Sequence, residues 1–152
     1  MLTAHLPSGY CLGKVFGWKR WMFGAALIGA VLPDFDLIFF YFVDDRAFHH
    51  HEYWVHIPFF WACTACLVLS LLWRSQYRPI ALAFFAAIFM HLTLDSLSGG
   101  IMWLAPMNDE LFSLVTVSAT QSHWILSYIF HWTFAFEIAI WGLAAYLYVK
   151  DR

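Results

Sequence analysis

Histidine and aspartate side chains recur in this sequence at spacings that suit the coordination of a metal ion. His91 and Asp95 lie four residues apart, so on a helix both side chains project from one face, about one turn apart. Asp34 and Asp36 form an acidic pair, and the stretch 49-HHHEYWVH-56 holds four histidines. Mixed imidazole and carboxylate ligands suit zinc, manganese or iron better than calcium or magnesium. A cation held by such ligands lowers the pKa of its bound water and generates a nucleophile at neutral pH.

The segments that carry these residues are apolar enough to lie in a membrane. The 152 residues are 62% hydrophobic and only 12% charged, with a mean hydropathy of +0.67, whereas a soluble domain has roughly 25% charged residues. A chain of this size cannot bury so much apolar surface in its own core, so lipid must solvate part of it. Four apolar segments approach the ~20 residues that a transmembrane helix needs, at about residues 21–43, 57–73, 79–98 and 124–149.

We therefore predict an all-α fold, a polytopic integral membrane helical bundle with about four transmembrane helices in one membrane-embedded domain over residues 1–152. The first helix is expected to be broken, because Pro33 disfavours helical geometry in the residue before it and suits the first turn of a new helix. Asp34 would then lie near a helix N-terminus, where negative charge is favoured. Residues 5–18 are expected to form a short interfacial or partly inserted helix, and residues 99–123 a long connection folded over the site.

Ionisable side chains inside the apolar segments require compensation. A charged group at membrane depth costs at least about 2.5–3.5 kcal/mol on the insertion scale. The apolar segments nevertheless contain Asp34, Asp36, His91, Asp95, His131 and Glu137. A bound cation would offset much of this cost by pairing with the acids, and the supply of ligands is enough for one metal ion or for two.

The basic residues predict how the bundle lies in a membrane. If the first helix starts in the cytoplasm, seven lysines and arginines lie inside and only Arg46 lies outside, as the positive-inside rule requires. Both chain termini are then cytoplasmic, and the histidines and aspartates converge on the outer, periplasm-like side. The net charge of −2 and the lack of a basic stripe argue against a nucleic-acid partner, so membrane lipid is the expected neighbour.

Each candidate residue also has a purely structural explanation. His91 and Asp95 could form a hydrogen bond to another helix. Asp34 and Asp36 could cap the broken helix. His131 could bond to a neighbouring helix, and Glu137, six residues further on, is expected to point elsewhere. The run His49–His51 could be a solvated loop patch, and within it we favour His51 as the ligand.

Four motifs, taken in order, resemble those of a known family. They are 4-AHLPSGYCLG-13, 29-GAVLPDFD-36, 51-HEYWVH-56 and 91-HLTLDSLSGGIMWLAP-106. Together they look like the YdjM-like family of predicted metal-dependent hydrolases of bacterial inner membranes, whose pattern has an N-terminal histidine, a P-D-x-D, an H-x4-H and an H-x3-D. The resemblance spans about residues 4–106 and implies a set of metal ligands, namely His5, Asp34, Asp36, His51, His56, His91 and Asp95.

Two features of the sequence qualify this resemblance. Glu52 and Val55 stand where many members carry an arginine and a threonine, so an arginine contact to a substrate phosphate is not implied here. His5 belongs to the implied ligand set, yet a cytoplasmic N-terminus is remote from a site on the outer side. Either residues 1–17 dip into the membrane and deliver His5 to a cavity at mid-depth, or His5 is not a ligand.

The composition, the ligand pattern and the resemblance together predict an integral membrane metal-dependent hydrolase. Zinc, or else manganese or iron, would activate water against an ester or phosphoester of a lipid or lipid-linked substrate at the outer leaflet, with Asp36 or His131 as general base. A metal-ion or proton transporter is one alternative, because ionisable residues inside membranes also mark ion pathways. Another is a non-enzymatic membrane protein that a metal stabilises.

Overall fold

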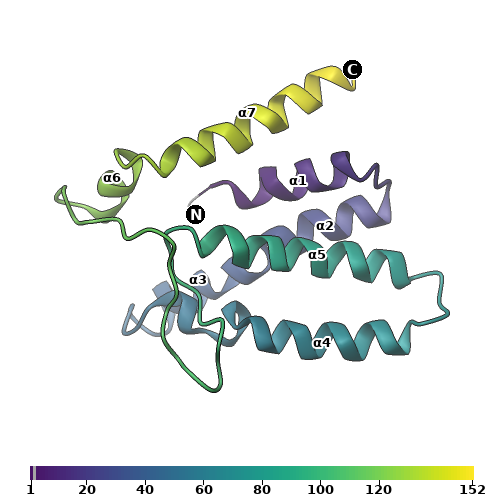
Figure 1. The fold of residues 1–152 in the computed structure, drawn as a ribbon, viewed down its shortest axis with the longest axis horizontal. Helices are drawn as coiled ribbons and strands as arrows, with labels where there is room; N and C mark the ends of the chain where they lie inside the picture. The colour runs from purple at the N-terminus through teal and green to yellow at the C-terminus, as the bar shows by residue number, and fades with distance from the viewer. Residues whose placement is uncertain (2) are drawn as a thin grey trace.

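The protein is built from helices, as Figure 1 shows for the computed structural model, which describes Met1 and residues 3–152. Within that part, the α-helices are α1 (His5–Val15), α2 (Trp21–Val31), α3 (Asp36–Phe42), α4 (Pro58–Leu71), α5 (Arg78–Asp95), α6 (Trp124–Ile129) and α7 (Phe134–Lys150). Three short 3-10 helices are η1 (Pro33–Phe35), η2 (His50–Glu52) and η3 (Trp54–His56). The described residues contain no β-strand, only an isolated bridge between Ile101 and Phe112. The prediction of an all-α fold is confirmed.

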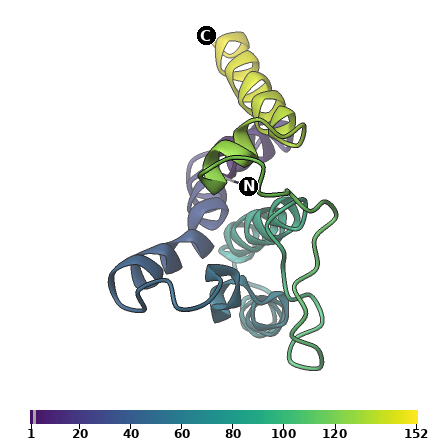
Figure 2. The same cartoon turned by 90° about the vertical axis from the view of Figure 1, so that its left-hand side faces the viewer.

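Helices α2 and α5 form the centre of the bundle, where they pack against each other. Helix α1 lies over both of them, α7 packs on α1, and α4 packs on α5 from the other side (Figure 1). Figure 2 views the bundle from the end at which α5 finishes and shows α7 standing apart from the central helices. An apolar core built around Trp61, Phe85 and Ile88 joins α4 to α5.

Small residues let α1, α2 and α5 approach closely. A Cβ atom added at Gly29 of α2 would lie 2.4 Å from the carbonyl oxygen of Phe84 in α5. A Cβ atom added at Gly9 of α1 would lie 2.5 Å from the Cβ of Ala30. In lipid there is no hydrophobic driving force for helix association, so close packing of this kind contributes much of the attraction between membrane helices.

We expect Gly29→Ala to destabilise the bundle. The added methyl group has no space beside the Phe84 carbonyl, so α2 and α5 must separate, which typically costs about 1–3 kcal/mol. Thermal unfolding of the detergent-solubilised protein measures the change. Gly24→Ala is the matched control in the same helix, because a Cβ atom at Gly24 meets nothing within 4 Å and alanine is the better helix former. Equal melting temperatures for the two variants would contradict the expected clash.

The first apolar segment is broken at the predicted residue. Helix α2 ends at Val31, η1 begins at Pro33, and the two parts of the segment are bent by 49°. Pro33 occupies the first turn of η1, Asp34 follows it, and Asp36 begins α3. The bend therefore places two carboxylates at the junction of two helical pieces, where free backbone N–H groups favour negative charge.

Helix length and composition support fewer membrane spans than the sequence suggests. Among the described helices, only α5 is by itself long and apolar enough to cross a membrane, and the bent pair formed by α2 with Pro33–Phe42 passes the same test when taken as one span. Helix α4 is apolar but shorter. The count is therefore one span, or two if the bent pair is one span, against the four predicted.

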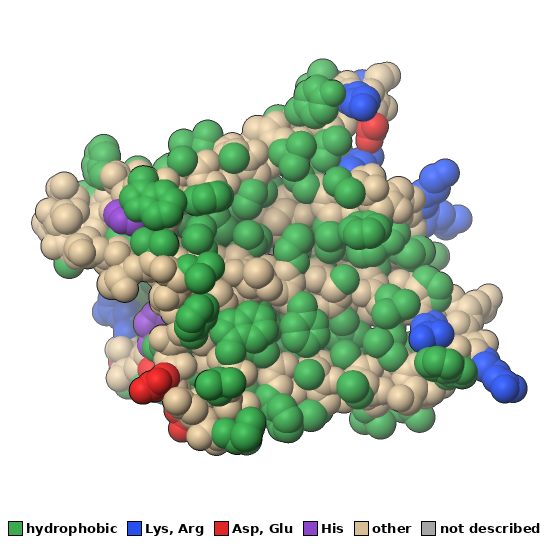
Figure 3. All heavy atoms as spheres, in the orientation of Figure 1, with side chains coloured by type: hydrophobic (Ala, Val, Ile, Leu, Met, Phe, Trp, Pro, Cys, Tyr) green, Lys and Arg blue, Asp and Glu red, His purple; other side chains and the backbone are tan. Residues whose placement is uncertain are grey.

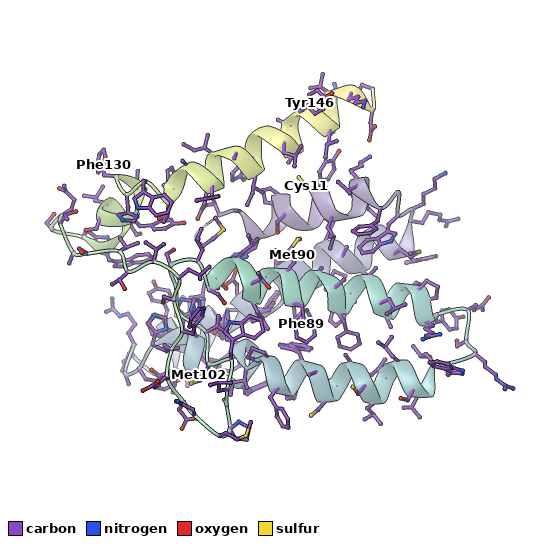
Figure 4. All side chains as sticks on the ribbon, in the orientation of Figure 1. Cys11, Phe89, Met90, Met102, Phe130 and Tyr146 are labelled. Carbon is purple, nitrogen blue, oxygen red and sulfur yellow. The ribbon has the colours of Figure 1, made fainter. Side chains whose placement is uncertain are left out.

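The last apolar segment, residues 124–149, is not one helix, contrary to the prediction. Helix α6 ends at Ile129, α7 begins at Phe134, and Phe130 (labelled in Figure 4) lies in the turn between them. The turn lets the Tyr128 hydroxyl donate a hydrogen bond of 2.7 Å to Glu137 Oε1. In a continuous helix these two residues would be separated by about 13 Å along the axis, so the hydrogen bond requires the break.

The connection 99–123 folds back against the end of α5. Ile101 and Phe112 exchange backbone hydrogen bonds of 2.9 Å, so the connection doubles back on itself. Further along, the Leu114 N–H donates to the Ser96 carbonyl at 2.8 Å, and the Trp103 indole donates to the Ser96 hydroxyl at 2.7 Å. These bonds fix the connection beside Asp95, the last residue of α5.

The two chain termini lie at different ends of the bundle (Figure 1). The Met1 amino group contacts Asp95 Oδ1, whereas the C-terminus lies at the far end of α7. Of the two alternatives for the predicted cytoplasmic N-terminus, the contacts of Met1 and His5 with Asp95 favour the one in which residues 1–17 bring His5 to the site. Helix α1 starts at the end where α5 finishes and runs away from it.

Candidate metal centre

Four side chains from three separate elements meet at the end of α5. His5 of α1, Asp34 of η1, and His91 and Asp95 of α5 each offer a ligand atom, and these atoms all lie within 4.8 Å of one another. The spacing of His91 and Asp95 along α5 puts both on the face that α2 covers. The bend at Pro33 turns Asp34 toward them. Three of the four residues are buried, and Asp34 is partly exposed.

Asp95 occupies the middle of the cluster. Its Oδ2 atom lies 3.0 Å from His91 Nε2 and 3.7 Å from both His51 Nε2 and His56 Nε2. Its Oδ1 atom lies 3.1 Å from His5 Nε2. Although Asp95 is fully buried, Oδ2 has no hydrogen-bond partner among the described residues unless one of these imidazoles carries its proton on Nε2. A buried carboxylate oxygen without a partner is costly, and a cation at this point would satisfy it.

The His91 ring is oriented so that Nε2 faces the other ligands. Its Nδ1 lies 2.8 Å from the carbonyl oxygen of Ala30 in α2, which accepts the ring N–H. In the neutral ring Nε2 then carries a lone pair, and it lies 3.3 Å from His56 Nε2. Backbone carbonyls that accept the second ring N–H are the usual means of orienting a metal-binding histidine. The contact with Ala30 depends on the close approach of α2 and α5.

The other two rings show the same arrangement. His51 Nδ1 lies 2.7 Å from the Gly100 carbonyl and 3.0 Å from that of Gly99. His56 Nδ1 lies 2.8 Å from Asp36 Oδ2. In each ring Nδ1 therefore faces an acceptor, and Nε2 is left for Asp95 or for a metal ion.

Burial keeps these two loop histidines neutral. The loss of hydration lowers the pKa of His51 to about 2, and the same cause lowers the pKa of His56. A neutral imidazole is the form that binds a metal. Both rings are therefore ready to act as ligands at physiological pH without first losing a proton.

The distances between donor atoms fit a single metal ion. Ligands bound tetrahedrally to zinc at about 2.0–2.1 Å are separated from one another by roughly 3.3–3.4 Å. Asp34 Oδ1 lies 3.7 Å from His91 Nε2 and 4.0 Å from His56 Nε2. With the separations already given for His56, His91 and Asp95, the donor pairs span 3.0–4.0 Å. The donor set, two imidazoles and two carboxylates, also suits zinc.

The family model for YdjM inner membrane proteins matches residues 1–150. The chain belongs to this family. The match includes every residue of the cluster, and it confirms the resemblance that the four sequence motifs indicate. The comparison with curated proteins found no match, and neither did the comparison with solved structures.

The structure brings all seven residues implied by the YdjM resemblance to one end of the bundle. Asp36 differs from the rest, because it lies behind His56, 2.8 Å from the ring nitrogen that faces away from Asp95. The same Oδ2 atom lies 3.7 Å from His50 Nδ1. Asp36 is thus placed to orient the His56 ring from the side opposite to Asp95, and it also lies near the His50 ring.

The loop of residues 49–56 contributes more candidate metal ligands than the sequence suggests. His50, His51 and His56 form a second group whose ligand atoms lie within 4.8 Å of one another, although we favour only His51 in the run from His49 to His51. His49 does not belong to this group. Its ring accepts a hydrogen bond of 3.2 Å from the His51 N–H and caps η2.

His131, a candidate general base, lies outside both groups. It belongs to the turn between α6 and α7, where its Nδ1 lies 2.9 Å from the Thr133 hydroxyl and 3.4 Å from the Thr133 backbone nitrogen. Such bonds from a side chain to nearby backbone compete with helical hydrogen bonds. The ring therefore accounts for part of the helix break and is not brought to the ligands by any described contact.

The backbone carbonyls that orient the ligand rings could not be predicted from the sequence. The carbonyls of Ala30, Gly99 and Gly100 orient two ligand rings, but any residue carries a carbonyl. The only local signal is the Gly-Gly pair four residues after Asp95. A Cβ atom at Gly99 would lie 2.5 Å from Cε1 of the His51 ring, so this position must lack a side chain.

Gly99→Ala is expected to weaken metal binding. The added methyl group displaces the His51 ring and breaks its contacts with the two carbonyls, and disruption of such orienting contacts typically costs about 10–100-fold in metal affinity. Titration of the metal-free protein with zinc measures the dissociation constant. Gly142→Ala is the matched control, because a Cβ atom there meets nothing within 4 Å. An unchanged dissociation constant would show that His51 is not needed for binding.

Proposed function

We propose that this YdjM family member is an integral membrane metal-dependent hydrolase. Asp34, His56, His91 and Asp95 hold a divalent ion, zinc in the first place and manganese or iron in the second. When bound, such an ion lowers the pKa of a water ligand toward neutrality. The reaction is hydrolysis of an ester or phosphoester of a lipid or lipid-linked substrate.

One observation carries this proposal. His91 Nε2 and His56 Nε2 face each other at 3.3 Å, and the opposite nitrogen of each ring already faces an acceptor. Two neutral rings in this state would point lone pairs at each other and at Asp95 Oδ2, which lies 3.0 Å from His91 Nε2 and 3.7 Å from His56 Nε2. A cation between them removes both penalties at once.

The exposure of the ligands supports a lipid-like substrate. The Asp34 side chain is 29% exposed, whereas those of His56, His91 and Asp95 are at most 1% exposed, so a substrate approaches from the side of Asp34. Next to it, Phe35 is 58% exposed on the same short helix. A substrate whose apolar chain packs on such side chains can bring its polar head to the ion.

We also propose that four segments span the membrane, namely α2 with α3, α4, α5 and α7, in one domain over residues 1–152. Lysines and arginines gather at one end of the bundle and histidines at the other (Figure 3). By the positive-inside rule the basic end, with the C-terminus, is cytoplasmic, and the metal centre faces the periplasmic side of the inner membrane. Met1, beside Asp95, then lies toward the periplasmic side as well.

A second ion is part of the proposal. With two ions bound, His5, Asp34, His91 and Asp95 hold the first, because their donor atoms lie within 4.8 Å of one another, and His50, His51 and His56 hold the second. Asp95 Oδ2, at 3.7 Å from two of these rings, would lie between the two ions. Metal analysis of the purified protein therefore has a defined expectation of one or two ions per chain.

The test is metal analysis of detergent-purified protein, followed by hydrolysis assays on phosphorylated lipids and on carboxylic ester lipids. The wild type is expected to retain zinc, and His56→Ala to lose it. His123→Ala is the control, because the contacts of that ring within the described part of the chain are with its neighbour Trp124 and with the start of its own helix. Bound metal without hydrolysis of either class would favour a structural metal, and metal flux into vesicles that depends on His91 would favour a transporter. Protein without any metal would end the proposal.

A further inference from the structure

A second buried carboxylate lies outside the metal centre, on α7. Glu137 is fully buried, although most of α7 is exposed. Its Oε2 atom accepts two hydrogen bonds from Thr3, one of 2.8 Å from the backbone N–H and one of 2.6 Å from the hydroxyl. Its Oε1 atom accepts the bond from the Tyr128 hydroxyl. A carboxylate within an apolar helix is costly to bury, and these donors from Thr3 and Tyr128 offset that cost.

The contact with Thr3 matters because Thr3 leads directly into α1. Thr3 lies two residues before His5, the first residue of that helix. Ala4, at the N-cap of α1, has no side chain that caps the helix, so no local interaction of that kind fixes where α1 begins. Glu137, 134 residues away along the chain, holds Thr3 just before the helix, and the contact of the Met1 amino group with Asp95 anchors the same segment.

Two residues after Thr3, His5 contacts His91 and Asp95 of the metal centre. The His5 ring stacks on the His91 ring with centroids 3.8 Å apart and planes inclined by 23°, and its Nε2 reaches Asp95 Oδ1 at 3.1 Å. Only 3% of His5 is exposed. A shift of about 1 Å in the start of α1 would break these contacts.

We propose that Glu137 is a positioning residue for the metal centre, which holds Thr3 and thereby places His5 against Asp95 and His91. Helix α7 thus supports the metal centre through Glu137, although it provides no metal ligand. The inference rests on the proposed function insofar as His5 belongs to a metal site. The placement of His5 itself is independent of any metal.

The first experiment tests this placement in metal-free protein. Detergent-purified protein treated with EDTA is modified with diethylpyrocarbonate, and labelling of His5 is measured by mass spectrometry. We expect His5 to be protected in the wild type and to react at least about tenfold faster in Glu137→Ala, because the imidazole becomes accessible. Glu137→Gln should protect His5 almost as well, because its amide oxygen still accepts both bonds from Thr3.

The matched control is Glu110→Ala, which removes an exposed glutamate whose described bonds reach only Asn108. Thr3→Val gives a second, milder variant if Glu137→Ala fails to fold. It removes the hydroxyl that bonds to Glu137 and accepts from the Trp141 indole at 3.1 Å, but keeps the backbone bond. We expect intermediate labelling of His5. Protection equal to the wild type in every folded variant would overturn the proposal.

The second experiment asks whether Glu137 acts through His5. Zinc affinity is measured for Glu137→Ala, His5→Ala and the double variant. We expect each single change to weaken binding about 10–100-fold, as for other residues that orient ligands, and the double variant to be no weaker than His5→Ala. Independent, multiplying effects would show that Glu137 acts by another route and would overturn the inference. If the wild type binds no metal, the proposed function fails, and the labelling of His5 still decides the role of Glu137.

Discussion

Asp95→Asn is expected to remove the metal ion from the purified protein and to lower hydrolysis by about 10³-fold or more. Asp95 lies within 3.0–3.7 Å of the Nε2 atoms of His51, His56 and His91 and is the acid nearest to all of them. The amide keeps the shape of the side chain but has no negative charge to offer. Without the ion, the attacking water would keep a pKa far above neutrality.

Metal content and initial hydrolysis rates measure this effect. Asp109→Asn makes the same chemical change at an exposed position in the connection between α5 and α6 and should leave both quantities unchanged. Because the asparagine is nearly isosteric, the variant should remain folded. Full activity with stoichiometric metal in Asp95→Asn would show that the ion, if present, lies elsewhere.

Removal of the metal from the wild type is expected to lower the melting temperature strongly. An ion that binds only the folded state stabilises it by about 4 kcal/mol when its free concentration is 1,000 times the dissociation constant. The metal-free protein also retains the buried Asp95 oxygen that has no hydrogen-bond partner among the described residues. Both effects act in the same direction, so EDTA should destabilise the protein and added zinc should restore it.

Thermal unfolding in detergent, with EDTA and with added zinc, measures this change. Asp95→Asn is the informative comparison, since its melting temperature should no longer respond to zinc. The variant also leaves the buried Met1 amino group without its carboxylate partner, so in EDTA it should be less stable than the wild type. A wild-type melting temperature that is the same with EDTA as with zinc would exclude a metal that binds the folded state preferentially.

Several features of the fold follow from local sequence. Pro33 breaks the first apolar segment at the expected residue, because the proline ring restricts its neighbour wherever the chain goes. The four-residue spacing of His91 and Asp95 places both on one face of α5, because helical periodicity depends only on local geometry. The apolar stretches at residues 58–71 and 78–95 are helices close to the predicted bounds.

Other features depend on partners far along the chain. Phe130 to Thr133 contain no proline or glycine, and the break there depends on the hydrogen bond between Tyr128 and Glu137 and on the His131 ring. The position of His50 could not be read from a run of three histidines, since loop geometry decides which ring turns inward. The same holds for the N-terminus, which lies beside Asp95 because α1 packs on α2 and α5.

The apolar, helical character of the chain and the identity of the residues able to bind a metal could be predicted from the sequence, because both follow from side-chain chemistry and spacing. Which ring nitrogen of each histidine faces the cluster depends on how the helices pack. That choice rests on acceptors such as the Ala30 carbonyl, 61 residues from His91. Likewise, only the packing of α7 brings Glu137 to Thr3. Interactions between residues so distant along the chain leave no local pattern, since they arise when the helices pack.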